Sequence, residues 1–220
     1  MNIYYYIVNR YRKERMIGMF TKVLKGIKNF YYLVKAINSI AKKRKNPMAA
    51  VSLVWGSIFN EGLQFNWGIR FVSKEIMEGG GDNNLKLNAP DAIFATIPKI
   101  CCVLVCLENL EEATKQMNAR EWAFYVIQGI AHEYRHAQQI EYFESVGLDS
   151  NTALHYLACT YCYLTSPIES DAIQYSRNIT SITYENGCLK LRSKYISVSK
   201  AMKEVAEEVR QHPQVFDYKA

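Results

Sequence analysis

The sequence predicts an α+β fold, in which a small β-sheet accompanies one long helix and a long basic amphipathic helix precedes both. Three observations support this prediction: an apolar stripe of helical period before residue 46, short alternating apolar runs after it, and a proline-free helical pattern over residues 121–143. The chain has 220 residues, of which 49% are hydrophobic. This length and composition suit one domain with a buried core and an appended segment.

Residues 13–43 are predicted to form the N-terminal helix, because apolar residues recur from Met16 to Ile37 at steps of three and four. Residues 1–46 hold 12 Lys and Arg against one acid, whereas residues 47–220 hold 15 against 20. The net charge of +6 therefore comes from this segment. We expect the helix to dock on the domain formed by residues 47–220, with its lysines in water. The alternative is that residues 10–45 contact an anionic membrane surface or nucleic acid.

Strands are predicted in the first half of the domain. The alternating runs Val51–Phe59 and Leu63–Phe71 predict a hairpin, and Ala92–Ile97 and Ile100–Leu107 predict two strands on either side of Pro98. The last run is almost continuously apolar, which is typical of a strand buried on both faces.

Capping and turn signals predict the other elements. In chain order they are a helix over 110–118 with a capping box from Asn109 and Glu112, the helix over 121–143, a helix over 151–164, a helix from Ser166-Pro167 to Arg177, a hairpin around Asn186-Gly187 and a closing helix over 198–209.

The helix over 121–143 contains the motif H-E-x-x-H, formed by His132, Glu133 and His136. Residues four apart lie on one face of a helix, so both imidazoles can reach one metal ion. Glu133 can lean over the same ion as a general base. This spacing is typical of zinc-dependent hydrolysis, most often of peptides. Gly129 in the same helix would let a neighbouring backbone approach closely.

A catalytic zinc ion usually has three protein ligands, so a third must come from elsewhere. The downstream candidates are Glu141, Glu144, Asp149, His155, Glu169 and Asp171. Glu141 and Glu144 share the helix of the histidine pair and are expected to point away from the ion. Arg135 should also point away from it, toward Glu141, Glu144 or Asp171.

The segment Glu169-Ser170-Asp171-Ala172-Ile173-Gln174-Tyr175 resembles the E-x-x-A-(D/N)-x-(F/Y) helix that follows H-E-x-x-H in gluzincin metallopeptidases. These include the prenyl-protein (CAAX) proteases and the repressor-cleaving peptidases of phages and mobile elements. The resemblance spans Glu121 to Tyr175. It implies a zincin-like catalytic core in residues 47–220, in which His132, His136 and Glu169 bind zinc and Glu133 is the base.

The chain departs from that pattern at Ile173, where these families carry Asp or Asn. That residue often supports a metal-bound histidine, so the role is unfilled here or falls to Asp171. Asp171 also stays open as the third ligand, because it and Glu169 lie on opposite flanks of one apolar stripe.

These residues predict a zinc metallopeptidase with Zn²⁺ as cofactor and a peptide or protein as substrate. The Ile100–Leu107 strand is expected to hold the sheet edge along which the substrate pairs. The candidates for stabilising the oxyanion are His155, Tyr161, Tyr163 and Tyr175.

Two other functions are compatible with the sequence. The chain can be a non-enzymatic interaction protein that has a structural or vestigial metal site and binds through its basic helix. Alternatively, residues 1–46 inhibit or tether the enzyme.

The cysteines indicate a reducing compartment, since six are scattered without the spacing of a disulfide framework. We expect a cytoplasmic protein, with membrane association as the alternative. The charge-free run Ser150–Ile168 is interpreted as a buried helix because its Asn, His and Pro would be costly in lipid. His155, Cys159 and Cys162 share one helical face and are interpreted as a buried stripe, not a second metal site.

Overall fold

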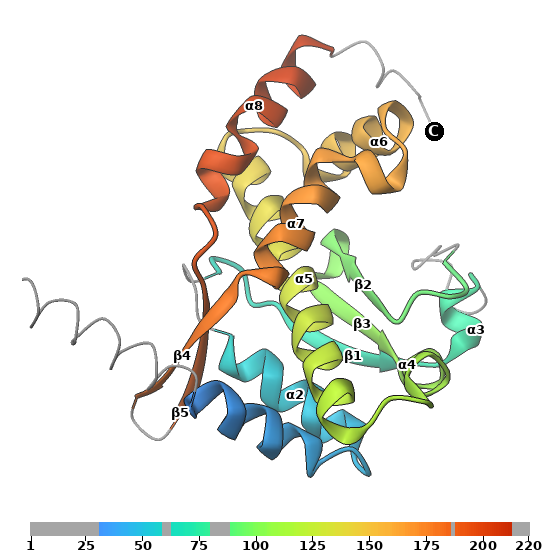
Figure 1. Cartoon of the computed structure of the whole chain (residues 1–220). Coiled ribbons are helices and arrows are strands. Elements are labelled where there is room, and N and C mark those ends of the chain that lie inside the picture. The colour runs from blue at the N-terminus through green and yellow to red at the C-terminus, as the bar shows by residue number, and fades with distance from the viewer. Residues whose placement is uncertain (1–30, 59–62, 80–88, 186–187, 213–220) are drawn as a thin grey trace, which may run out of the picture.

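The computed structural model describes residues 31–58, 63–79, 89–185 and 188–212. A sheet of β1 (Gly68–Val72), β3 (Cys102–Cys106) and β2 (Phe94–Ile97), in that order, lies beside the long helix α5 (Ala119–Ser145) (Figure 1). β3 runs parallel to β1 and antiparallel to β2. All five residues of β3 are buried, as predicted for this strand. The predicted mixed α+β class is therefore confirmed.

α5 passes between two hydrophobic cores. Its first half buries Trp122, Val126 and Ile130 in the larger core, which also contains residues of β3 and α2 (Pro47–Ser57). Its end buries Phe143 in a second core shared with α6 (Ser150–Thr160) and α8 (Val198–Gln211). A helix of 27 residues is about 40 Å long, which is enough to reach both.

The predicted hairpin of Val51–Phe59 and Leu63–Phe71 is wrong in its first strand, because residues 47–57 form helix α2. The Asn46 side chain accepts a hydrogen bond from the backbone N–H of Ala49, and Pro47 occupies the first turn, where it needs no donor. The buried residues of α2 include Ala50, Val51 and Val54, which have helical spacing. The alternation of Val51, Leu53 and Trp55 therefore does not reflect burial.

The second strand starts later than predicted, at Gly68, because the preceding segment is bound by a carboxylate. Glu141 accepts hydrogen bonds from the backbone N–H groups of Gln64 and Phe65 and from Nε1 of Trp67, at 2.7, 2.7 and 2.9 Å. These two backbone donors are thus bonded to α5 instead of to a strand.

The predicted capping box of Asn109 and Glu112 is also wrong. α4 (Leu107–Thr114) already includes Asn109, whose side chain donates to the carbonyls of Pro90 and Ala92. The capping box lies instead at the start of α5, between Asn118 and Glu121.

The remaining predicted elements are present. They are α6, α7 (Pro167–Arg177), β4 (Ile179–Glu185), β5 (Cys188–Ser193) and α8. Three short helices were not predicted: α3 (Lys74–Met77), η1 (Pro98–Ile100) and η2 (Tyr163–Thr165). β4 and β5 pair antiparallel as predicted, while the turn at Asn186-Gly187 lies outside the described residues. α6 ends at Thr160, four residues before its predicted end.

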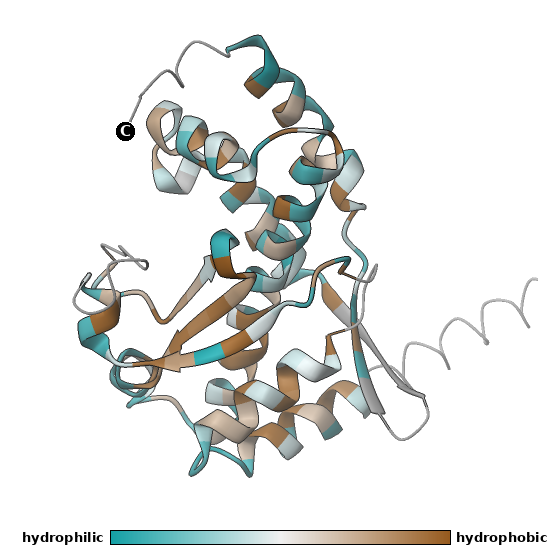
Figure 2. Ribbon diagram, turned by 180° about the vertical axis from the view of Figure 1, so that it is seen from behind, coloured by the Kyte–Doolittle hydropathy of each residue, from teal (hydrophilic) through white to brown (hydrophobic). Residues whose placement is uncertain are grey.

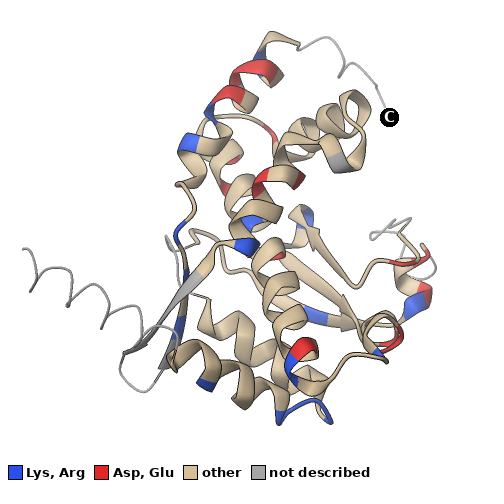
Figure 3. Cartoon of the chain, viewed as in Figure 1, with Lys and Arg blue, Asp and Glu red and all other residues tan. Residues whose placement is uncertain are grey.

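The N-terminal helix is described over residues 31–41, and the predicted part before residue 31 lies outside the described residues. Ala36 and Ile40 are each 1% exposed and belong to the larger core, so this part docks as expected. A basic turn at 42–45 follows, which is blue in Figure 3. Its Arg44 donates to the carbonyls of Thr114 and Met117. This turn therefore lies beside the start of α5.

Apolar residues are frequent in the strands of the three-stranded sheet (Figure 2). Within the described ranges, no helix combines the length and the apolar character that a membrane span requires.

Gly129 lies where β2 crosses α5. A Cβ atom built there would overlap the ring of Phe94, at 2.8 Å from Cδ2 and closer still to Cε2. A close approach is therefore present at Gly129, but the partner is an aromatic side chain of β2 and not the predicted backbone. Since Gly129 is four residues before Glu133, this contact brings β2 to the part of α5 that carries the motif.

We predict that Gly129→Ala lowers the free energy of unfolding by about 1–3 kcal/mol, because the new methyl group overpacks the α5–β2 contact. Urea denaturation measures this change. Gly56→Ala is the matched control: a Cβ on Gly56 in α2 meets nothing within 4 Å, so this variant should be as stable as wild type or more stable. A stable Gly129→Ala protein would contradict the assigned contact.

Candidate metal centre

His132, His136 and Glu169 converge on one point between α5 and α7. The Nε2 atoms of the two histidines are 3.0 Å apart. Oε2 of Glu169 lies 3.2 Å from Nε2 of His132, and Oε1 lies 3.4 Å from Nε2 of His136. The helices explain this convergence. A spacing of four residues places both imidazoles on one face of α5, and the first turn of α7 carries Glu169 to them.

The three side chains suit a metal ion. A tetrahedral ion with bonds of about 2.0–2.1 Å has ligand atoms about 3.3 Å apart, close to the separations observed here. Oε2 of Glu169 is buried, and the contact with Nε2 of His132 at 3.2 Å does not give it a hydrogen bond of good geometry, so a cation at this point would satisfy the oxygen better. Among the described residues, these three form the one group of His, Cys, Asp and Glu side chains that could hold an ion.

Glu133 lies beside this group and is 7% exposed. Thr96 of β2 donates a hydrogen bond from Oγ1 to Oε2 of Glu133, at 2.7 Å. One carboxylate oxygen is thereby held by the sheet. Oε1, for which the described residues provide no hydrogen bond, is left to contact a water molecule or a substrate.

A cavity of about 330 Å³ opens onto these groups. Its polar lining consists of Thr96, His132, Glu133, His136, Tyr163 and Glu169. Its apolar lining consists of Ala89, Ala92, Phe94, Ala95, Ile140, Leu154 and Ile168. The cavity therefore joins the candidate metal-binding side chains to an apolar wall and to three consecutive residues of β2.

His136 and Glu169 each stabilise the charged form of the other. Burial alone would lower the pKa of His136, but hydrogen bonding to Glu169 and the negative charges of Glu133 and Glu169 raise this pKa from 6.5 to about 9. Burial would likewise raise the pKa of Glu169, but hydrogen bonds and positive charge from the two histidines hold it well below its ordinary range. In the metal-free protein the raised pKa of His136 therefore favours its protonated ring at neutral pH.

The other candidates for the third ligand lie elsewhere. Asp171 forms an ion pair with Arg135, at 2.7 Å from Oδ2 to Nε, so Asp171 is the partner among the three acids proposed for Arg135. Glu141 binds the segment before β1, as described above. Glu144 accepts from the backbone N–H of Ser150, and Asp149 caps α6 through the N–H of Thr152.

Of the four candidates for an oxyanion stabiliser, the structure brings only Tyr163 to the cavity. Tyr161 donates its hydroxyl to Glu208, and the ring of Tyr175 packs against the guanidinium of Arg135. Tyr163 is 67% exposed, but desolvation of its hydroxyl beside the site and the negative charge of Glu169 raise its pKa, so the hydroxyl stays a hydrogen-bond donor at neutral pH.

The interpretation of His155, Cys159 and Cys162 as a buried stripe is wrong, since all three are exposed. α6 buries the face formed by Ala153, Tyr156 and Leu157. Cys162 lies beyond the end of the helix, so the three residues do not share a helical face.

Sequence reasoning missed two residues at the site. Gln139 contacts Nδ1 of His136 through Oε1, at 2.8 Å. Its position three residues after His136, on the same side of the helix, was the available signal. Thr96 is a polar residue in an otherwise apolar predicted strand, but only the tertiary structure shows that it faces Glu133.

No protein-family model matches the chain, and neither a curated protein nor a solved structure matches it. The geometry of the site is therefore the evidence that bears on the function of the chain.

We predict that zinc binds more tightly as the pH rises. Because the pKa of His136 is about 9 in the metal-free fold and 6.5 when unperturbed, its proton stabilises that fold fully below pH 6.5, and this stabilisation disappears between pH 6.5 and 9. Zinc must displace the same proton, so its apparent Kd should fall by about tenfold per pH unit over this range. Competition with a chelating dye in zinc-buffered solution measures the Kd.

Glu169→Gln is the control for this prediction. Without the carboxylate, His136 loses its main favourable partner, so zinc should bind more weakly and the pH dependence should end at a lower pH. A Kd that is constant from pH 6.5 to 9 in wild type would contradict the assignment.

Proposed function

We propose that the protein is a zinc metallopeptidase that hydrolyses peptide bonds with Glu133 as general base. One observation carries the proposal: His132, His136 and Glu169 converge beside a buried glutamate, in a cavity bordered by an edge strand. A donor set of two imidazoles and a carboxylate is typical of catalytic zinc in peptidases. The resemblance of residues 121–175 to gluzincins supports the same function.

Zinc, when bound, polarises a substrate carbonyl and lowers the pKa of a coordinated water to about 7. Oε1 of Glu133 would take a proton from this water, because Thr96 already occupies Oε2. Once the water oxygen had formed a bond to the carbonyl carbon, Glu133 would return the proton to the amide nitrogen, so that the C–N bond breaks and a neutral amine leaves. Burial of Glu133 among the cavity residues limits the access of bulk water to this transfer.

The substrate would pair with β2. The expectation that Ile100–Leu107 provides the sheet edge is wrong, because β3 is hydrogen-bonded to β1 on one side and β2 on the other. β2 is the edge strand near the site, and Phe94, Ala95 and Thr96 line the cavity. An extended peptide can add to such an edge through its main chain, which fits a peptide substrate.

Glu133→Gln should retain zinc and lose hydrolysis, since the amide cannot accept the proton. We expect about one zinc per chain by elemental mass spectrometry, and cleavage of a mixed peptide library slower by about 100-fold or more. Glu144→Gln, on the same helix but away from the cavity, should cleave like wild type.

Equal cleavage by wild type and Glu133→Gln would disprove this mechanism. A folded wild-type protein that binds no zinc would remove the enzymatic proposal altogether. The non-enzymatic interaction protein with a vestigial site would then be the better hypothesis.

Tyr163 is proposed to stabilise the negative charge that develops on the carbonyl oxygen. Tyr163→Phe should lower kcat by about 100-fold with a small effect on KM, because the hydroxyl would act mainly in the transition state. Tyr161→Phe is the matched control, since its hydroxyl contacts Glu208 and not the cavity. Steady-state kinetics on a cleaved peptide separate the two parameters, and a loss confined to KM would assign Tyr163 to substrate binding instead.

A further inference from the structure

Gln139 connects the metal-binding face of α5 to α7. It is 1% exposed, and its Oε1 lies 2.8 Å from Nδ1 of His136. Its Nε2 donates to the backbone carbonyl of Ile168 at 2.9 Å and to Oδ2 of Asp171 at 2.8 Å. One buried side chain thus contacts a histidine of the site and two groups at the start of α7.

These contacts allow only one orientation of the amide. A backbone carbonyl and a carboxylate both accept hydrogen bonds, so the amide group that faces them must be the NH₂. Oε1 must then face His136, and it can only accept. Nδ1 of His136 therefore carries a proton, and the lone pair of a neutral ring lies on Nε2, the atom directed at His132 and Glu169.

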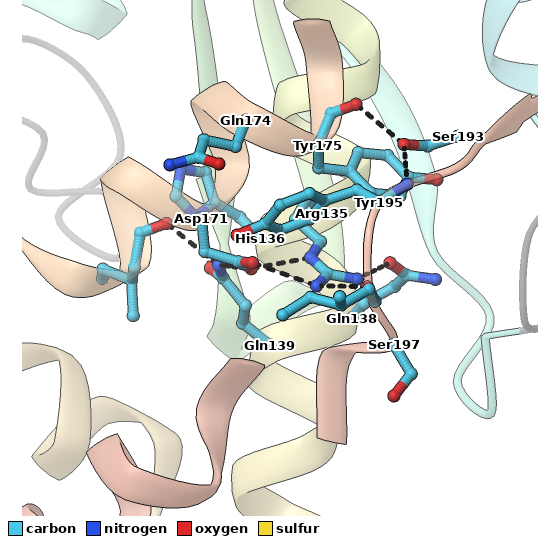
Figure 4. A network of polar contacts seen from close by, with 12 residues as sticks. Arg135, His136, Gln138, Gln139, Asp171, Gln174, Tyr175, Ser193, Tyr195 and Ser197 are labelled. Atoms are coloured by element: carbon cyan, nitrogen blue, oxygen red, sulfur yellow. Dashed lines mark hydrogen bonds and ion pairs between the residues drawn. The ribbon is translucent and has the colours of Figure 1, made fainter. Parts of the chain in front are cut away.

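The ion pair between Arg135 and Asp171 holds this amide in place (Figure 4). Nε and Nη2 of Arg135 donate to the two carboxylate oxygens, at 2.7 and 3.1 Å. Nη1 donates to Gln138, and Nη2 also donates to the carbonyl of Ile196. These bonds hold the carboxylate of Asp171 in one position. Its Oδ2 in turn holds the NH₂ group of Gln139.

We propose that Gln139 is the positioning residue of the metal centre, which selects the Nε2-ligating form of His136. The proposal rests on the proposed metal site. It also explains how the chain accommodates Ile173, where the resemblance led us to expect an acid: Asp171 supports the histidine indirectly, through the amide of Gln139. Support of this kind fixes the ring and raises its basicity as a ligand.

The test compares Gln139→Met with Gln138→Met in the full chain. Both glutamines lie on α5, are 4% exposed or less, and bond to the Arg135–Asp171 pair, and Gln139 also contacts Nδ1 of His136. The zinc Kd of each variant is measured by dye competition at constant pH, beside its urea denaturation. We expect zinc to bind about 10–100-fold more weakly in Gln139→Met. Gln138→Met should keep the wild-type Kd although it loses stability.

A second measurement requires no substitution. Long-range ¹H–¹⁵N NMR spectra of the zinc-loaded wild type report which imidazole nitrogen of His136 carries the proton. A proton on Nδ1 supports the proposal. Because this measurement uses the wild type, it remains valid even where Gln139→Met does not fold. Zinc on Nδ1, or an equal Kd in the two methionine variants, overturns it.

The outcomes separate the two proposals. If wild type binds zinc and cleaves peptides while the two variants have equal Kd values, only the role of Gln139 is lost. If wild type binds no zinc, the metal centre itself is wrong and the role of Gln139 fails with it.

Discussion

Arg135 and Asp171 form a buried ion pair across the interface of α5 and α7, and the candidate site depends on this interface. Both residues are 5% exposed or less, and the guanidinium also contacts the rings of Tyr175 and Tyr195. Removing one partner of a buried pair typically costs about 3–5 kcal/mol, whereas apolar residues in place of both can be as stable. We therefore interpret the pair chiefly as a constraint on the position of α7. Glu169 lies two residues before Asp171 on α7, so fixing the position of α7 also brings Glu169 to the histidines.

The cavity is assembled from both cores that α5 connects. The sheet side contributes Thr96, which holds the carboxylate of Glu133, the proposed base, and α7 contributes Glu169, which completes the cluster on the histidines. The proposed base and the third candidate ligand are therefore positioned by different parts of the fold. α5 carries Glu133 between His132 and His136 and is continuous over its 27 residues, so it fixes the distance between these two contributions.

The sequence allowed prediction of what is encoded locally. The spacing of His132 and His136, the proline that starts α7 and the spacing of the closing helix each lie within one helix, where periodicity determines the face. Contacts between distant segments could not be predicted in this way. Asn46-Pro47 reads equally as the end of one helix and the start of the next, and only packing into the larger core shows that α2 follows.

The choice between Glu169 and Asp171 shows the same limit in one turn of helix. Both acids flank a single apolar stripe, so the periodicity of α7 gives neither of them preference. α5 distinguishes the two acids. On one flank of the stripe it presents two hydrogen-bond donors, the guanidinium of Arg135 and the NH₂ group of Gln139, which need a carboxylate that binds no metal. Asp171 satisfies them, and Glu169 is the acid that remains for the histidine nitrogens on the other flank. The donors around each carboxylate, more than its position in the motif, therefore determine its role.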